Sequence, residues 1–309
     1  MTGFEEIIVE LSYNCNLSCS MCGFGKHVNP FSQSKFLSFE NYKTILHQIG
    51  DRTKTIRLNG RGESTIHPDF VEIVNYTKSK YPELNINLFS NFTFKSKRIL
   101  DSLIENRVQL FISLDSPDEM ELSEIRRGAD LRLIEKNMQR LAEMSNRPFV
   151  IFTIQESNTH RIFDISQFAF RNNCHILYNT IRRDAGVDEF VGIVTSKLND
   201  IKSQFNRVKE LYANSNLQCL YPDQLSGIAL QEKSATKTHG TMASCPALDK
   251  ELCILYDGTT TPCNMFNPFP YGNIFQQSLS EIWNGQPRLE FLSSHKEYYY
   301  CKNCANLGV

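Results

Sequence analysis

Three cysteines near the start of the chain have a spacing that suits a metal cluster. Cys15, Cys19 and Cys22 form a CxxxCxxC run directly after a predicted strand at 7–9. Thiolates are the soft ligands that iron–sulfur clusters and zinc prefer. A four-iron cluster held by three thiolates keeps one iron without a protein ligand, so that iron is open to a small molecule. The alternative is a zinc site completed by a distant fourth ligand.

A second group of cysteines lies in the last 65 residues and also suits a metal. The Asp257-Gly258 pair is a strong turn signal, which predicts a β-hairpin formed by 252–256 and 259–262. The hairpin brings the cysteine before it close to the cysteine that follows it, and a closing CxxC supplies two more thiols. We therefore expect four thiolates to converge, on an iron–sulfur cluster or on zinc. The four residues are Cys245, Cys263, Cys301 and Cys304.

Composition limits the class of protein. The chain has 309 residues, a formal net charge of -1, 41% hydrophobic and 22% charged residues, which is typical of a globular protein. This charge gives no attraction to nucleic acid or to an anionic membrane. No apolar run is long enough to cross a bilayer, and the N-terminus lacks the features of a secretory signal, so we expect a cytoplasmic protein. Ten cysteines in a reducing compartment indicate metal binding rather than disulfides.

Alternating strand and helix patterns predict an α/β fold. Six strands separated by helices imply a parallel sheet with right-handed crossovers, an open (β/α)6 arc of a barrel. We expect this partial barrel over 1–180, a connector with a helix and a loop over 181–244, and a small cysteine-rich β-hairpin and helix module over 245–309. The predicted strands are 7–9, 55–58, 84–89, 108–114, 149–154 and 175–178, and the predicted helices are 39–49, 69–79, 97–105, 133–144, 162–171 and 197–212.

Short polar segments follow several of these strands, where α/β folds carry their chemistry. The segment 59–63 (NGRGE) follows the second strand, Ser113-Leu114-Asp115 ends the fourth, and Arg126 and Arg127 come after a short helical stretch. With the CxxxCxxC run, these motifs resemble the radical S-adenosylmethionine (SAM) superfamily.

That resemblance implies a [4Fe-4S] cluster on Cys15, Cys19 and Cys22, with SAM on the open iron. Reductive cleavage of SAM would yield a 5′-deoxyadenosyl radical that abstracts a hydrogen atom from substrate, with a flavodoxin- or ferredoxin-type protein as reductant. Arg61 and Ser64 depart from the family's Gly-Gly-Glu-Pro pattern. The residues implied to contact SAM are Gly62, Glu63, Asn91, Ser113, Asp115, Arg126 and Asn158, with Arg127 as an alternative to Arg126.

The C-terminal segment is similar to a SPASM module shortened to a twitch domain. The match comprises 271–274 (YGNI), 278–284 (SLSEIWN) and the closing CxxC. It implies one auxiliary [4Fe-4S] cluster with all four irons held by Cys245, Cys263, Cys301 and Cys304, and zinc becomes the less favoured alternative. In architecture the chain is similar to 2-deoxy-scyllo-inosamine dehydrogenase, a member of the superfamily that oxidises an aminocyclitol alcohol.

The resemblance leaves two outcomes open for a substrate radical. Loss of an electron to the auxiliary cluster gives dehydrogenation, whereas a hydrogen atom returned by a thiol gives epimerisation. Cys219 in the connector and Cys253 on the hairpin are the candidate donors, and Cys174 is expected to pack in the core. Each is alternatively a buried structural thiol.

A small molecule of the carbohydrate or aminocyclitol type is the expected substrate. The chain begins at the first barrel strand, which leaves no room for an extra peptide-binding domain. Arg182 and Arg183 follow the last strand and would suit an anionic substrate. Two alternatives remain: a maturase acting on a ribosomally synthesised peptide, and an iron–sulfur electron-transfer protein that never meets SAM.

Overall fold

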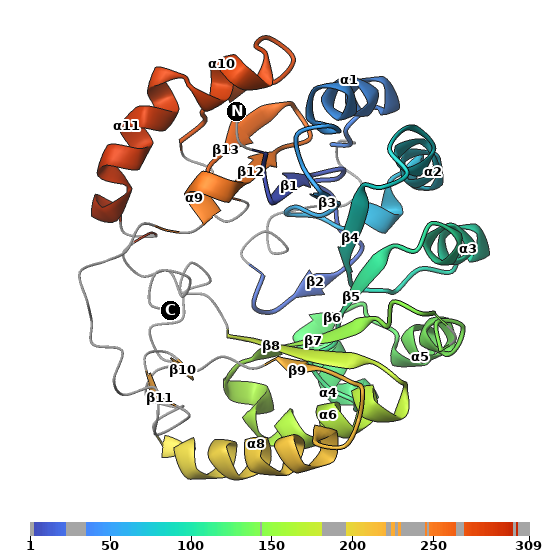
Figure 1. The fold of residues 1–309 in the computed structure, drawn as a ribbon. Coiled ribbons are helices and arrows are strands. Elements are labelled where there is room, and N and C mark those ends of the chain that lie inside the picture. The colour runs from blue at the N-terminus through green and yellow to red at the C-terminus, as the bar shows by residue number, and fades with distance from the viewer. Residues whose placement is uncertain are drawn as a thin grey trace.

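A ten-stranded sheet curves around the centre of the molecule (Figure 1). The structure is a computed structural model that describes residues 3–22, 35–142, 144–180, 196–220, 224–225, 228–229, 245, 247–263, 269–298 and 301. The order is β14-β13-β12-β1-β3-β4-β5-β7-β8-β9, with parallel pairs from β12 to β9. The strands are β1 (Glu6–Val9), β3 (Thr55–Arg57), β4 (Asn85–Ser90), β5 (Gln109–Ser113), β7 (Phe149–Ile154), β8 (His175–Thr180), β9 (Cys219–Leu220), β12 (Glu251–Ile254), β13 (Thr259–Thr261) and β14 (Gly272–Asn273).

Helices cover the outer face of this sheet (Figure 1). The predicted α/β fold with an open parallel arc is confirmed, and all six predicted strands are present. The helix predicted at 133–144 is wrong at its C-terminal end, because Leu141 and Met144 are buried from turns that follow the helix rather than from the helix itself. The helices are α1 (Phe39–Ile49), α2 (Phe70–Lys80), α3 (Lys97–Glu105), α4 (Glu119–Ile125), α5 (Leu131–Gln139), α6 (Ile162–Arg171), α8 (Leu198–Tyr212), α9 (Ala247–Lys250), α10 (Leu279–Trp283) and α11 (Gln286–Ser294).

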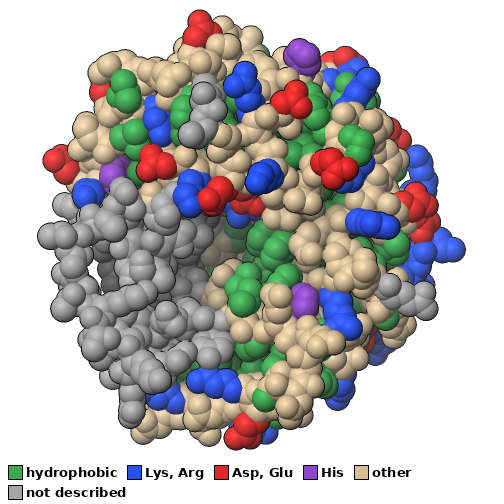
Figure 2. All heavy atoms as spheres, in the orientation of Figure 1, with side chains coloured by type: hydrophobic (Ala, Val, Ile, Leu, Met, Phe, Trp, Pro, Cys, Tyr) green, Lys and Arg blue, Asp and Glu red, His purple; other side chains and the backbone are tan. Residues whose placement is uncertain are grey.

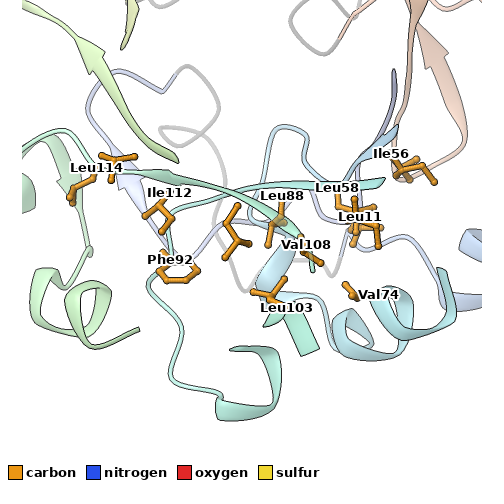
Figure 3. Packing of buried hydrophobic residues seen from close by; sticks show 14 of the residues in the cluster. Leu11, Ile56, Leu58, Val74, Leu88, Phe92, Leu103, Val108, Ile112 and Leu114 are labelled. Carbon is orange, nitrogen blue, oxygen red and sulfur yellow. The ribbon is translucent and has the colours of Figure 1, made fainter. Parts of the chain in front are cut away.

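The main core lies between the sheet and these helices. Side chains alternate across each strand, so Leu110 and Ile112 of β5 face outwards together with Leu88 of β4. They meet helical residues such as Leu103 of α3 and Val74 of α2 (Figure 3). This packing holds the strand ends in fixed positions, which is what a site built on those ends requires.

The inner, concave face of the sheet carries a different set of side chains. Phe89, Phe111 and Phe149 stack across three neighbouring strands, with ring centroids 4.3 and 5.2 Å apart. The guanidinium of Arg57 lies 5.3 Å from the Phe89 ring and forms an ion pair with Glu6 at 3.3 Å. Figure 2 shows a hollow near the centre of the molecule, with hydrophobic side chains on the part of its wall that is not grey. The barrel interior is therefore lined by aromatic rings.

The predicted hairpin is present and joins the barrel sheet. β12 and β13 pair antiparallel, and Gly258 in the turn has a φ of 82°, in the left-handed region that favours glycine. β12 also pairs in parallel with β1, so the C-terminal module extends the barrel. The ring of Trp283 in α10 packs on Phe4 with centroids 4.5 Å apart.

Arg182, Arg183 and Cys304 lie outside the described residues, as does most of the connector after residue 220 in which a loop was predicted. In the part of the chain that is described, no helix has both the length and the apolar character needed to span a membrane.

Candidate active site

The CxxxCxxC loop follows β1 at the carboxyl edge of the sheet. Its short strand β2 (Ser18–Cys19) pairs antiparallel with β6 (Arg126–Arg127), which places Cys19 opposite Arg126. Cys15 interacts electrostatically with both Cys19 and Cys22, so the three thiols form one group. Nη1 of Arg126 donates to Sγ of Cys19 at 4.0 Å. The backbone N–H of Cys22 donates to the carbonyl of Cys19 at 3.2 Å, so the structure places the three thiols in one short loop. In the described residues no group of three such ligands is already arranged to hold a metal ion.

Burial controls the ionisation of these thiols. Burial raises the pKa of Cys15 to about 12, and the carboxylate of Glu63 adds to the effect. Burial also raises the pKa of Cys19, against the opposing charge of Arg126. Both groups are therefore protonated near neutral pH in the absence of metal, and binding a cluster would release these protons.

Asp115 and Arg126 form a buried ion pair beside the cysteine loop. Nε of Arg126 donates to Oδ2 of Asp115 at 2.7 Å, and the backbone N–H of Thr153 donates to Oδ1 at 2.7 Å. The Asp115 side chain is 0% exposed and Arg126 is 9% exposed, whereas Arg127 is exposed. Of the two arginines considered from sequence, Arg126 is the one inside the site.

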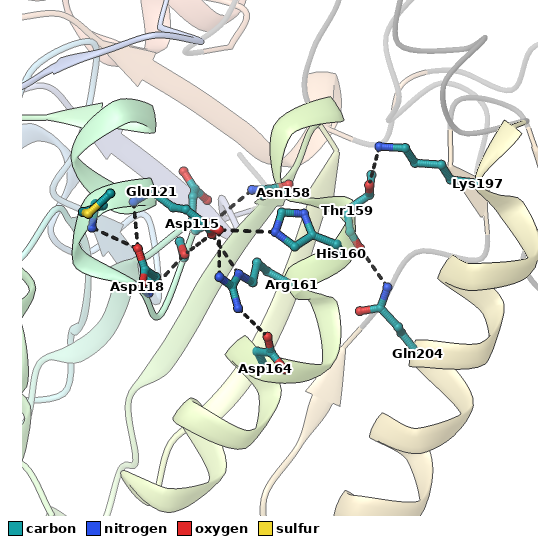
Figure 4. Close-up of polar contacts among 12 residues, drawn as sticks. Asp115, Asp118, Glu121, Asn158, Thr159, His160, Arg161, Asp164, Lys197 and Gln204 are labelled. Carbon is teal, nitrogen blue, oxygen red and sulfur yellow. Dashed lines mark hydrogen bonds and ion pairs between the residues drawn. The ribbon is translucent and has the colours of Figure 1, made fainter.

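Asn158 lies next to this pair, and its side chain makes three hydrogen bonds to backbone groups. Its Nδ2 donates to the backbone carbonyls of Asp115 and Thr153, and its Oδ1 accepts from the backbone N–H of Gln155. Figure 4 shows Asn158 close to Asp115. Asn158 therefore joins the ends of β5 and β7, and its predicted contact with SAM stays a prediction.

A second ion pair, between Arg161 and Glu121, attaches the helix that precedes Arg126 to the segment after β7. Nε and Nη2 of Arg161, in the 3-10 helix Glu156–Arg161, donate to both carboxylate oxygens of Glu121 in α4 at 2.8 and 2.7 Å (Figure 4). Nη1 of Arg161 donates to Asp164 at 2.8 Å. These contacts fix the position of α4, and Arg126 follows directly after the last residue of this helix.

Glu63 organises the segment after β3. Its Oε1 accepts from the backbone N–H and hydroxyl of Thr65 and from the hydroxyl of Ser90, and its Oε2 accepts from the backbone N–H of Asn91. Asn91 in turn donates to the side chain of Asn16 in the cysteine loop at 2.8 Å. Glu63 and Asn91 thus link two strand ends to the cysteine loop.

Gly62 lies against the backbone of residues 12–14, which lead into the cysteine loop. A Cβ at this position would meet backbone atoms, with the carbonyl oxygens of Asn14 and Ser12 at 2.3 and 2.5 Å. Only glycine fits this approach. Gly62 thus has a steric role that agrees with its predicted place in the site.

Gly62→Ala is expected to destabilise the protein by about 1–3 kcal/mol, because overpacking against backbone forces the loop to move. It is also expected to reduce the iron retained after anaerobic reconstitution. Urea unfolding and iron analysis measure the two effects. Gly3→Ala is the matched control, since its Cβ would have no atom nearer than 3.2 Å; equal behaviour of the two variants would contradict the prediction.

Arg61, which departs from the family pattern, has a partner that the sequence did not suggest. Its Nε and Nη2 donate to the two carboxylate oxygens of Glu10 at 2.9 and 2.7 Å, and its guanidinium lies 4.3 Å from the ring of Tyr13. Glu10 is fully buried, directly after β1. This pair ties the segment 59–63 to the first strand.

Several buried polar atoms near the carboxyl edge have no partner. Among the described residues these include Nδ2 of Asn14, Oδ1 of Asn59 and Nε2 of Gln155, which follow β1, β3 and β7. Buried amides normally make hydrogen bonds, so a polar ligand over this edge is expected to supply them. Ser113 ends β5 on the inner face. These residues, with the three thiols, fit a cluster and a polar small molecule such as SAM.

Three of the four predicted auxiliary ligands are described, and the structure places them together. Tyr271 interacts electrostatically with all three, although no three His, Cys, Asp or Glu residues in the described part of the chain are already arranged to hold a metal ion. Each is partly buried against the core. They are Cys245, Cys263 and Cys301, and Cys304 lies outside the described residues.

The two candidate hydrogen donors lie on opposite faces of the sheet. Cys253 shares the inner face with Ile8, is 0% exposed, and interacts electrostatically with Cys263. Burial raises its pKa to about 12, so the thiol keeps its hydrogen. Cys219 pairs with Ile176 on the helix-facing side and packs near Tyr212 of α8. The structure brings Cys253, and not Cys219, towards the barrel interior.

Sequence comparisons agree with this geometry. The Radical SAM superfamily matches residues 9–165, and SPASM, an iron–sulfur cluster-binding domain, matches residues 245–305. Together the two domains imply SAM and two iron–sulfur clusters as cofactors.

Curated relatives are similar over nearly the whole chain. The chain is 23% identical to the tungsten-containing aldehyde ferredoxin oxidoreductase cofactor-modifying protein of Pyrococcus furiosus, over 97% of this chain and 87% of that protein. It is 24% identical to the cysteine-type anaerobic sulfatase-maturating enzyme of Clostridium novyi, over 98% and 86%. It is 25% identical to the sporulation killing factor maturation protein SkfB of Bacillus subtilis, over 97% and 68%.

Solved structures share the fold. Streptococcus suis SuiB bound to the precursor peptide SuiA has a TM-score of 0.72 at 16% identity, covering 100% of this chain and 71% of that chain. BtrN in complex with AdoMet and 2-DOIA has a TM-score of 0.51 at 18% identity, covering 98% and 94%. Since the superfamily match extends over half of the sequence, the chain belongs to the radical SAM superfamily and carries a SPASM-type iron–sulfur cluster-binding domain.

Proposed function

We propose that this radical SAM enzyme is a maturase that modifies a ribosomally synthesised peptide. The observation that carries the proposal is similarity across nearly the whole chain to proteins named for maturation, including the sulfatase-maturating enzyme and SkfB. The structural neighbour SuiB, bound to a precursor peptide, agrees with it. The alternative interpretation of the sequence is thus better supported than a small-molecule substrate, which retains the weaker support of BtrN.

The described residues suit a reaction that must be shielded from solvent. When bound, the cluster and SAM supply a 5′-deoxyadenosyl radical, which abstracts a hydrogen atom from the substrate. Arg126 and Asp115 hold the cysteine loop against the end of β5, and Gly62 and Glu63 hold it against β3 and β4. The stacked rings on the inner face provide apolar walls for a reactive intermediate.

Deuterium transfer distinguishes a peptide from a small-molecule substrate. Cells grown in heavy water supply an extract that is divided by size into a peptide fraction and a metabolite fraction. Each fraction is incubated with the reduced, reconstituted enzyme and SAM, and deuterium in 5′-deoxyadenosine is measured by mass spectrometry. We expect label from the peptide fraction, because two relatives are named for maturation and the structural neighbour SuiB was solved with a precursor peptide.

A matched reaction with Cys19→Ala sets the background, because that variant lacks a ligand of the SAM-binding cluster. Label from the metabolite fraction alone would contradict the peptide proposal and favour a carbohydrate or aminocyclitol. Loss of label on protease treatment of the peptide fraction would independently support a peptide.

A Cys253 variant tests whether a thiol of the enzyme returns a hydrogen atom to the substrate radical. If the reaction is an epimerisation, this thiol is the candidate that lies towards the barrel interior, and wild-type enzyme is expected to place solvent deuterium on the product carbon. Cys253→Ala is expected to lose at least nine tenths of that incorporation while 5′-deoxyadenosine continues to form. Cys219→Ala is the control, since Cys219 faces the helices. Undiminished incorporation in Cys253→Ala would remove Cys253 as the donor.

A further inference from the structure

One buried tyrosine in the C-terminal module has a hydroxyl group without a hydrogen-bond partner. Tyr271 is 2% exposed, and its hydroxyl is one of the unpartnered buried atoms among the described residues. Leaving a buried hydroxyl group without a hydrogen bond destabilises the folded protein. An acceptor is therefore expected beside it in the working protein.

The ring of Tyr271 is held so that its hydroxyl has a fixed direction. Its backbone N–H donates to the carbonyl of Thr260 at 2.8 Å, which attaches Tyr271 to β13, the strand that leads to Cys263. The ring packs on Phe291 of α11 with centroids 5.9 Å apart and an interplanar angle of 65°. Backbone and ring are thus both constrained by neighbouring elements.

The surroundings of this hydroxyl are those of the auxiliary site. Tyr271 pairs with Thr260 of β13, the strand that leads to Cys263. Its ring packs on α11, whose Arg288 donates to the carbonyl of Leu248, and the backbone N–H of Leu248 donates to the carbonyl of Cys245 at 3.1 Å. Arg288 cannot accept from the Tyr271 hydroxyl, because a guanidinium has no acceptor atom. Its guanidinium lies 3.6 Å from the Trp283 ring, and its Nε has no hydrogen-bond partner among the described residues. A phenol hydroxyl carries its proton at neutral pH and is a hydrogen-bond donor, and that of Tyr271 has no acceptor among the described residues.

We propose that the Tyr271 hydroxyl donates a hydrogen bond to a sulfur atom of the auxiliary iron–sulfur cluster and raises its reduction potential. Hydrogen bonds to cluster sulfurs are among the means by which a protein sets this potential. A donor favours the reduced state, because reduction adds negative charge to the sulfurs. This inference rests on the SPASM assignment and is independent of the peptide substrate.

The test compares Tyr271→Phe with the parent protein in a full-length chain whose Cys15, Cys19 and Cys22 are all alanine, so that only the auxiliary cluster loads. After anaerobic reconstitution, the midpoint potential is measured by redox titration followed by electron paramagnetic resonance. We expect equal iron content and an equilibrium constant for one-electron reduction at least tenfold lower in Tyr271→Phe, which is a shift of about 59 mV to lower potential.

Tyr42→Phe is the matched control, because it removes a buried phenol hydroxyl that pairs with Thr77 at the α1–α2 contact, away from the cysteines. A shift in Tyr271→Phe no larger than that in Tyr42→Phe would overturn the proposal. If Tyr271→Phe fails to retain iron, electron–nuclear double resonance of the parent decides: a strongly coupled proton that exchanges in heavy water supports the hydrogen bond, and its absence overturns it.

Discussion

Cys19→Ala is expected to abolish formation of 5′-deoxyadenosine from SAM and to remove about half of the iron, because one of the two four-iron clusters is lost. Cys19 lies at the centre of the loop, opposite Arg126 in the β2–β6 pair and within the electrostatic field of Cys22. Two remaining thiolates would not hold a cluster that already uses only three protein ligands. The measurements are iron and sulfide analysis and chromatography of the dithionite-reduced protein with SAM.

Cys174→Ala is the matched control for this experiment. Cys174 is buried in the core between the sheet and the helices, whereas Cys19 is only partly buried. We expect this variant to retain both clusters and SAM cleavage. A Cys19→Ala protein that still cleaves SAM, or iron loss of the same size in both variants, would contradict the assignment of the loop.

Arg126→Ala is expected to destabilise the fold by about 3–5 kcal/mol, because it leaves the carboxylate of Asp115 buried without its partner. Burial raises the pKa of Asp115. This loss of stability is therefore expected only at a pH high enough to ionise the Asp115 carboxyl group. It is also expected to weaken SAM cleavage, since Arg126 forms the pair that closes the cysteine loop. Urea unfolding of the apoprotein gives the first effect, and 5′-deoxyadenosine formation gives the second.

Arg127→Ala is the control that the chain itself offers. Arg127 is adjacent in sequence and in β6, but it is exposed. Surface substitutions of this kind usually change stability by no more than about 0.5 kcal/mol. If Arg127→Ala were as damaging as Arg126→Ala, the buried ion pair would not be the cause.

The repeating part of the fold was predictable because its signals are local. The inner and outer faces of each strand follow period-two alternation, and α1 and α6 have the bounds that their apolar spacing predicts. The turn at Asp257-Gly258 was equally local. The same reasoning predicted a helix at 133–144 that is too long at its C-terminal end, since α5 ends at Gln139. Leu141 and Met144 are buried and fall at helical spacing, although they lie in the turns after the helix.

Pairings over long distances in the chain were not predictable from one sequence. Nothing local indicates that β12 lies in parallel beside β1, some 245 residues earlier, and thereby joins the C-terminal module to the barrel. The separation of 245 positions follows from the register of Glu6 with Glu251. Cys219 was a candidate donor on the same grounds as Cys253, and only the sheet register shows that it faces the helices.

The site itself was partly predictable. Cysteine spacing and the residues after strands identified the loop, Gly62 and Arg126, because these depend on residue type and position. The partners of Glu63 and Asn158 were not predictable, since each is satisfied by backbone groups from other strands. The unpartnered amides of Asn14 and Gln155 can be found only by counting hydrogen bonds in three dimensions.

The central claim is that the loop of Cys15, Cys19 and Cys22 holds a cluster with one iron open to SAM. The most direct test is electron–nuclear double resonance on the reduced, anaerobic protein mixed with SAM that carries an isotopic label on its amino nitrogen. The account predicts a hyperfine coupling between that nitrogen and the cluster, which disappears in Cys19→Ala. A reduced cluster on this loop that shows no coupling to labelled SAM would contradict it.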